Sequence, residues 1–200
     1  MIDRDRAAAA IEEFLAALGH PPASDPELGN TGRLVASAFA DDFLVGYAMD
    51  PATILSQTVG ENAGSDVVAV CDVQTSILCP HHLMPATGVV HVCYAPAGRV
   101  VGLGALSRLI ECYARRMILQ ETLVQSIADA LCLHLGARGA GCIAELSPTC
   151  LTARGERCGG ARAICIGTAG EMRAGGVLHS AFLASLRRPA NETETRAHGL

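Results

Sequence analysis

Residues 76–117, SILCPHHLMPATGVVHVCYAPAGRVVGLGALSRLIECYARRM, hold the strongest structural signals in the chain. The part at 88–96 is rich in β-branched residues, and a similar run, DVVAVCDVQTSI at 66–77, precedes it. Together they predict two strands joined by the loop that holds Cys79. From Leu103 to residue 117, apolar residues recur at helical spacing. Hairpin strands followed by helices predict an α+β fold with an antiparallel sheet.

The hydrophobic periodicity predicts further elements on both sides of this stretch. Upstream, it predicts helices over 7–18 and 31–47, separated by a break rich in Pro and Gly. Downstream, we expect an amphipathic helix over 120–135, strands over 141–146, 149–154 and 162–167, and a closing helix over 177–186. The predicted organisation is an N-terminal helical region (1–65), a sheet-containing domain (66–188) and a flexible polar tail (189–200).

The composition excludes several classes of function. Half of the 200 residues are hydrophobic, which is enough for a core and argues against a disordered chain. The net charge of −5 provides no basic surface for nucleic acid. No apolar run reaches the roughly 18–20 residues of a membrane span, and the first residues are acidic, unlike those of a signal peptide. We therefore expect a cytoplasmic protein that binds neither membranes nor nucleic acid.

Nine cysteines are the most unusual feature of the composition. An odd number, in a chain for which we expect no export signal, argues against a disulfide framework. Most of them stand inside apolar runs, where a free cysteine acts as a small hydrophobic residue. Cys79, Cys150 and Cys158 differ, because polar or turn-forming residues surround them. These three are the candidates for chemistry.

The densest cluster of reactive side chains is Cys79-Pro80-His81-His82. A thiolate and an imidazole three residues apart can bind one tetrahedral ion, and Cys150 would supply a third ligand that leaves one position for water. Since adjacent histidines do not easily reach the same ion, one of them remains for proton transfer. Three interpretations stay open: a catalytic zinc site, a structural zinc site with Cys158 as fourth ligand, and a chance cluster.

A wider pattern resembles a known family. The motifs C-x-H-H at 79–82, A-R-R at 114–116, Q-E at 120–121 and C-x-x-x-R-G at 150–155 have the order and spacing of GTP cyclohydrolase I. The similarity runs over about 72–155, and more faintly over 30–47 and the final helix. It implies a T-fold catalytic domain over 66–188, with two packed helices on an antiparallel sheet. It also implies a toroidal homo-oligomer, usually a decamer, with active sites between subunits.

The same resemblance implies roles for individual residues. In the family, zinc lowers the pKa of its bound water so that hydroxide attacks C8 of the purine, while a histidine protonates the imidazole ring. A carboxylate accepts hydrogen bonds from the guanine edge. The matching residues are the zinc ligands Cys79, His82 and Cys150, the acid His81, the guanine-binding pair Gln120 and Glu121, and the retained arginines Arg108 and Arg154. Without the resemblance, Gln120 and Glu121 are explained as the start of a helix, where anions are favoured.

Several positions depart from the family pattern. Pro148 stands where the family has a histidine of the later ribose rearrangement, and proline cannot transfer a proton. Gly104 and Ala105 replace a Ser-Lys pair that contacts the triphosphate and the opened ribose. Leu34 stands where the family has a phosphate-binding arginine, and Arg33 lies one position before it. Ser37 stands where lysine is frequent, and Pro80 replaces a glutamate. The zinc and guanine groups persist, whereas the phosphate and ribose groups are reduced.

These observations predict a zinc-dependent hydrolase that opens the imidazole ring of GTP or a related guanine compound. Completion to dihydroneopterin triphosphate depends on the altered positions. One alternative is a paralogue that acts on a guanine base, a nucleoside or 8-oxoguanine in specialised metabolism. Another is a non-catalytic oligomer that binds zinc and a pterin or purine. His81 discriminates between enzyme and binder, because a binding protein needs no imidazole beside a metal-bound water.

Overall fold

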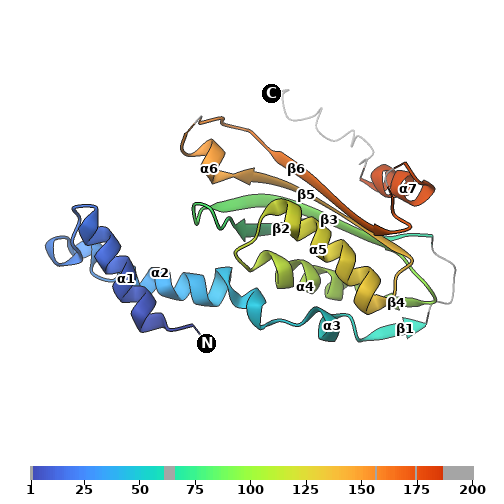
Figure 1. The fold of residues 1–200 in the computed structure, drawn as a ribbon, viewed down its shortest axis with the longest axis horizontal. Coiled ribbons are helices and arrows are strands. Elements are labelled where there is room, and N and C mark those ends of the chain that lie inside the picture. Colours follow the sequence, from blue (N-terminus) through green and yellow to red (C-terminus); the bar gives the residue numbers. More distant parts are fainter. Residues whose placement is uncertain (1, 61–65, 156, 174, 187–200) are drawn as a thin grey trace, which may run out of the picture.

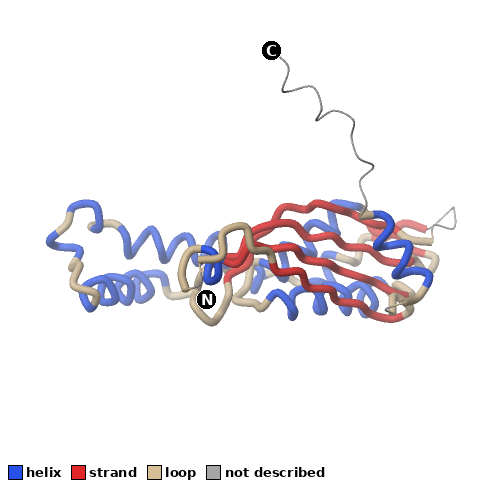
Figure 2. Tube along the Cα trace, turned by 90° about the horizontal axis from the view of Figure 1, so that it is seen from above, coloured by secondary structure: helices blue, strands red, loops and turns tan. Residues whose placement is uncertain are grey.

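A four-stranded antiparallel sheet forms the centre of the molecule (Figure 1). The computed structural model describes residues 2–60, 66–155, 157–173 and 175–186. The strands, in sheet order, are β2 (Val68–Leu78), β3 (Pro85–Ala95), β5 (Gly139–Pro148) and β6 (Ala163–Gly170). Helices α4 (Leu103–Ala114) and α5 (Gln120–Ala130) cover one face, and α7 (Val177–Ser185) lies on the other (Figure 2). The predicted α+β class, with two helices packed on an antiparallel sheet, is confirmed.

Side chains along β3 point alternately to the two faces of the sheet, and each face has its own hydrophobic core. Val90, Val92 and Tyr94 are fully buried in the main core, which includes residues of α4 and α5. Cys93 points to the opposite face, because successive side chains of a strand alternate, and it is buried there with Phe182 of α7. The sheet is therefore covered on both faces at this end of the strands.

The first two helices form a hairpin that extends away from the sheet (Figures 1 and 2). α1 (Arg4–Ala17) and α2 (Thr31–Ala38) lie side by side, joined by two short 3-10 turns, Pro22–Ser24 and Pro26–Leu28. α1 contains no buried residue. Gly32 allows the close approach, since a Cβ there would lie 2.6 Å from a carbonyl oxygen of α1.

The predicted single helix over 31–47 is wrong in its second half. α2 ends early, and a π-helical turn (Phe39–Phe43) and a 3-10 turn (Val45–Ala48) follow. Gly46 explains the change of path, because its N–H donates to the carbonyl of Arg115 at 2.9 Å. A Cβ at Gly46 would lie 2.6 Å from a carbonyl oxygen of α4. A regular helix would not bring the backbone into this contact.

The segment 149–154, predicted as a strand, instead begins with the short helix α6 (Thr149–Thr152). β5 ends at Pro148, which has no N–H to continue the ladder. The N–H of Ala153 then donates to the carbonyl of Thr149 at 2.9 Å and closes one helical turn. The expected strands before and after this segment are present as β5 and β6.

The remaining elements are short. α5 continues as a π-helical turn (Leu131–Leu135), and α3 (Pro51–Ile54) precedes β1 (Thr58–Gly60), which pairs with β4 (Arg99–Val101). None of the helices in the described ranges has the length and apolar character to cross a bilayer. The predicted tail over 189–200 lies outside the described residues, and the boundaries of the three predicted regions stay predictions.

Thr75 provides a test of this packing. It is 8% exposed, and its Oγ1 is buried without a hydrogen-bond partner among the described residues. Replacing it with valine removes the unsatisfied hydroxyl and keeps the branched shape, so we expect the free energy of unfolding to rise by about 1 kcal/mol. Urea denaturation measures the change.

Thr149→Val is the matched control for this prediction. Thr149 Oγ1 donates to the carbonyl of Pro85 at 2.6 Å. The same substitution there should lower the free energy of unfolding by about 1 kcal/mol, since it leaves a carbonyl without its donor. A loss of stability in Thr75→Val would show instead that the Thr75 hydroxyl has a partner.

Candidate active site

The loop between β2 and β3 presents the first candidate residues. It is tight, because the N–H of Cys79 donates to the carbonyl of Met84 at 3.1 Å and the N–H of Leu83 donates to the carbonyl of Cys79 at 3.0 Å. Leu83 adopts a φ of 51°, a conformation that is strained for a non-glycine residue. His81 and His82 are exposed in this loop.

The pairing of β3 with β5 brings the second cysteine to the same end of the sheet. Ala86 near the start of β3 pairs with Pro148 at the end of β5. The Thr149 hydroxyl fastens the start of α6 to β3 through the carbonyl of Pro85. Cys150 follows directly in α6, so strand pairing brings together a loop and a helix that are far apart in the sequence.

The segment that connects α4 to α5 lies at this same end of the sheet. Met117 forms a parallel bridge with Leu78, the last residue of β2, and the N–H of Ile118 donates to the carbonyl of Leu78 at 3.0 Å. The Arg115 guanidinium reinforces this contact by donating to Ser76 Oγ at 2.8 Å. The first residues of α5, Gln120 and Glu121, are therefore held next to the loop that follows Leu78.

These three segments enclose a pocket of about 180 Å³. Its walls are mainly apolar, with four of the sequence-predicted site residues among them. The lining residues are Ile77, Cys79, Met84, Pro85, Ala86, Ile118, Leu119, Gln120, Glu121, Pro148, Cys150 and Ala163. Sequence reasoning missed the apolar members, since a lone Met84 or Ile118 has no local signal that distinguishes a pocket wall from core.

The other predicted site residues do not line the pocket. His81, His82, Arg108 and Arg154 are all exposed. The Arg108 side chain lies over the first turn of α4, since a Cβ at Gly104 would lie 3.6 Å from its Nη1. The pocket wall of the described chain thus contains one carboxylate, two thiols and no cation.

Gln120 has a different environment from Glu121. Gln120 is 8% exposed, and its Nε2 donates to the carbonyls of Ala144 at 2.8 Å and Ala163 at 2.9 Å. Glu121 is exposed and makes no ion pair within the described part of the chain. Burial raises the pKa of the Cys165 thiol, and the negative charge of Glu121 raises it further, which places the carboxylate near β6.

The pocket contains sulfur donors of the kind that bind zinc. Cys79 and Cys150, two soft thiol ligands of the kind that zinc prefers, line one pocket. His82 stands three residues after Cys79 and is exposed, and the described residues contain no cluster of three donors already arranged around one point. Cys158 is exposed and is not among the lining residues. The two thiols fit the ligand chemistry of zinc, and His82 stands outside the pocket lining.

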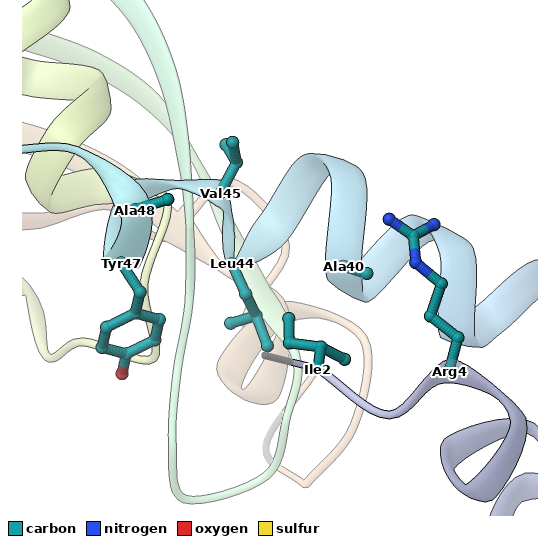
Figure 3. Close-up of a pocket in the computed structure, with 7 residues that line it drawn as sticks. All are labelled: Ile2, Arg4, Ala40, Leu44, Val45, Tyr47 and Ala48. Carbon is teal, nitrogen blue, oxygen red and sulfur yellow. The ribbon is translucent and has the colours of Figure 1, made fainter.

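A second hollow, of about 370 Å³, lies between the start of α1 and the turns after α2 (Figure 3). Apolar side chains line most of it, and Arg4 at its edge pairs with Asp41 through two hydrogen bonds of 2.5 and 2.6 Å. None of the sequence-predicted site residues borders this hollow. The pocket with the two cysteines is therefore the candidate active site.

Comparison with known proteins adds an independent observation. The sequence model of the family described as GTP cyclohydrolase I matches residues 7–187. The chain belongs to the GTP cyclohydrolase I family. This confirms the resemblance inferred from the motifs, and the observed sheet with its two packed helices agrees with the T-fold of GTP cyclohydrolase I.

Curated relatives in the GTP cyclohydrolase I family cover most of the chain. GTP cyclohydrolase 1 of Campylobacter lari is 40% identical over 73% of this chain and 76% of its own length. GTP cyclohydrolase 1 of Thermobifida fusca is 39% identical over 86% of this chain and 83% of its own length. The enzyme of the same name from Leifsonia xyli is 38% identical over 84% of this chain and 88% of its own length.

Gly88 tests the strand pairing that assembles the pocket. A Cβ at Gly88 would lie only 2.1 Å from the carbonyl oxygen of Glu145 on β5. Gly88→Ala should therefore lower the free energy of unfolding by about 1–3 kcal/mol, because β3 and β5 must separate. Gly60→Ala is the control, since no atom of the described residues lies within 4 Å of a Cβ on this other strand glycine. Equal stability of the two variants in urea denaturation would contradict the close approach.

Proposed function

We propose that the chain is a zinc-dependent hydrolase that opens the imidazole ring of a guanine-type substrate, with GTP as the first candidate. The observation that carries the proposal is the common wall of Cys79, Cys150 and Glu121 in one pocket. The relatives named GTP cyclohydrolase 1 support a cyclohydrolase activity on GTP. The roles of the individual residues follow from their chemistry and position.

The first turn of α5 suits recognition of guanine. Leu119, its N-cap residue, makes no side-chain capping bond, and the first N–H groups of a helix have no partner within the helix. Leu119, Gln120 and Glu121 all line the pocket. Backbone N–H groups here can donate to O6 of guanine, while the Glu121 carboxylate accepts from N1–H and the 2-amino group. Adenine has the opposite pattern on this edge, so it would leave the carboxylate unpaired.

Cys79, Cys150 and His82 are the residues that would hold zinc. When bound, zinc lowers the pKa of a coordinated water toward about 7 and so supplies a nucleophile at neutral pH. Both thiols line the pocket that Glu121 also lines. The guanine base bound by Glu121 and the sulfur ligands of zinc would therefore share one site. Pro80 stiffens the loop between the first thiol and the histidines.

His81 is the proposed proton donor. It stands between the two ligands of the same loop and is exposed, so substrate and solvent can both reach it. Imidazole is the side chain best suited to move a proton near neutral pH. Protonation of the purine at N7 makes C8 more electrophilic. Addition of one water at C8 opens the ring to a formamide, and a second water releases formate.

The composition of the pocket wall favours a second candidate, a guanine substrate without a triphosphate. No Arg lines the pocket within the described chain, and the exposed Arg108 and Arg154 lie outside it. Pro148, which does line it, has no group for the proton transfers of a ribose rearrangement. We therefore propose that ring opening is retained, and that the base, the nucleoside and 8-oxoguanine are substrates to compare with GTP.

We also propose assembly into a toroidal homo-oligomer, with ten subunits as the expected number. β2 and β6 are the outer strands of the described sheet. An outer strand presents unpaired backbone groups that pair readily with another chain. Ile164 and Ile166 on β6 are 56% and 52% exposed, so a neighbouring copy would cover apolar surface there. An assembly of this kind can also bring cations from a second subunit to the pocket.

A substrate panel tests the proposed reaction. Zinc-loaded protein should release formate from, or ring-open, at least one of GTP, guanosine, guanine and 8-oxoguanine, as mass spectrometry detects directly. His81→Ala should lower the turnover about 10²–10⁴-fold and leave substrate binding nearly unchanged. His20→Ala, at an exposed position of the N-terminal region, is the control and should keep full turnover. Binding without turnover in the wild-type protein would instead support the non-catalytic alternative.

Metal content and cysteine labelling test the zinc ligands. We expect one zinc ion per chain, lost in Cys79→Ser and Cys150→Ser and retained in Cys158→Ser, by elemental analysis. Zinc should protect Cys79 and Cys150 from iodoacetamide at pH 8, and chelation should expose them. Burial raises the pKa of Cys93 to about 12, so this thiol stays protonated and unlabelled with or without metal. Loss of zinc in Cys158→Ser would favour the closed, structural site.

A further inference from the structure

The side-chain amide of Gln120, at the edge of the pocket, donates its hydrogen bonds to the protein backbone. An amide nitrogen has two protons, and those of Gln120 go to carbonyl oxygens on two neighbouring strands, Ala144 on β5 and Ala163 on β6. The residue is 8% exposed. With both protons used, the nitrogen has none left to offer a ligand.

The two bonds hold the start of α5 against the sheet. On the opposite side, the N–H of Ile118 donates to the carbonyl of Leu78, so the same segment is also fastened to β2. The first turn of α5 is thus held from both sides within three residues. Glu121 comes immediately after Gln120, and its backbone has little freedom to shift.

One of the two acceptors of these bonds belongs to the same site. Ala163, whose carbonyl accepts one of the protons, lines the pocket together with Glu121. Glu121 itself has no ion pair within the described chain to fix its carboxylate. The position of that carboxylate in the pocket consequently depends on how the turn that carries it is anchored.

We propose that Gln120 is a positioning residue, which fixes the Glu121 carboxylate for selection of guanine and does not bind the base through its own amide nitrogen. The inference rests on the proposed function, because it concerns the same pocket. It assigns the two residues of the Q-E motif different tasks. One orders the helix start, and the other contacts the substrate.

Gln125 provides a matched control on the same helix. Its Nε2 donates to Asp129 Oδ1 at 2.9 Å and to the carbonyl of Thr168 on β6 at 3.1 Å. It therefore links α5 to the sheet by the same type of bond as Gln120. The difference is that these bonds are exposed and that Gln125 does not line the pocket.

The experiment compares binding of GTP and inosine triphosphate, which lacks the 2-amino group, by calorimetry on the zinc-loaded full-length protein. We expect the wild-type protein and Gln125→Met to prefer GTP by at least about 100-fold, because inosine triphosphate leaves the carboxylate partly unpaired. Gln120→Met should reduce this preference to about tenfold or less. Affinity for inosine triphosphate should change less than threefold, since that ligand makes fewer bonds to Glu121. If Gln120→Met does not fold, Gln120→Asn, which keeps the amide on a shorter arm, carries the same comparison.

A double-mutant cycle separates positioning from general support. In a Glu121→Gln background, adding Gln120→Met should leave the GTP preference unchanged, since the carboxylate that Gln120 positions is already gone. Equal losses for both nucleotides in Gln120→Met, or a further loss of preference in the double variant, would overturn the inference. A wild-type protein that binds neither these nucleotides nor guanosine, guanine or 8-oxoguanine would overturn the proposed function instead. Formate release by a Gln120→Met enzyme that retains full preference would overturn only the positioning role.

Discussion

The register between β3 and β5 is the constraint on which the candidate site depends. It sets Ala86 opposite Pro148, and so brings the loop after β2 and the helix after β5 to one end of the sheet. A shift by one residue would move every inward side chain to the opposite face and take Val90 and Val92 out of the main core. Burial of that apolar face therefore fixes the register, and the register in turn brings Cys79 and Cys150 to one pocket. The geometry of the pocket is a consequence of core packing at residues that take no part in it.

Much of the fold was predictable because the local signals and the tertiary structure agree. The hairpin of β2 and β3 and the helices α4 and α5 follow hydrophobic periodicity, which reflects the face that each element buries. The prediction was wrong over the second half of 31–47 and over 149–154, where contacts distant in sequence decide the backbone. At Gly46 the chain turns to meet the end of α4, and at Pro148 the ladder loses its donor. Neither event has a periodic signature.

The candidate site was predictable only in part. The residue types and spacing suggested Cys79 and His82 as a metal ligand pair with Cys150 as third ligand, and left a structural site and a chance cluster open. The resemblance favoured the catalytic site, because separation along the chain says nothing about strand pairing. The structure brings Cys79, Cys150, Gln120 and Glu121 to one pocket and leaves Arg108 and Arg154 outside it. The commitment of the Gln120 amide to two backbone carbonyls was invisible in the sequence, since it requires knowing which strands lie beneath the helix start.

The helical hairpin at the N-terminus has a consequence for how the molecule opens. α1 has 14 residues and buries none of them fully, whereas the sheet and its two helices share a continuous core. A helix of this length is marginal on its own in water, and its stability comes from contacts along one side with α2. Amide protons of α1 should accordingly exchange with solvent through local fraying, long before those of β3. The chain thus has two cooperative units of different stability. Thermal fluctuation can unfold the N-terminal hairpin locally while the pocket stays intact.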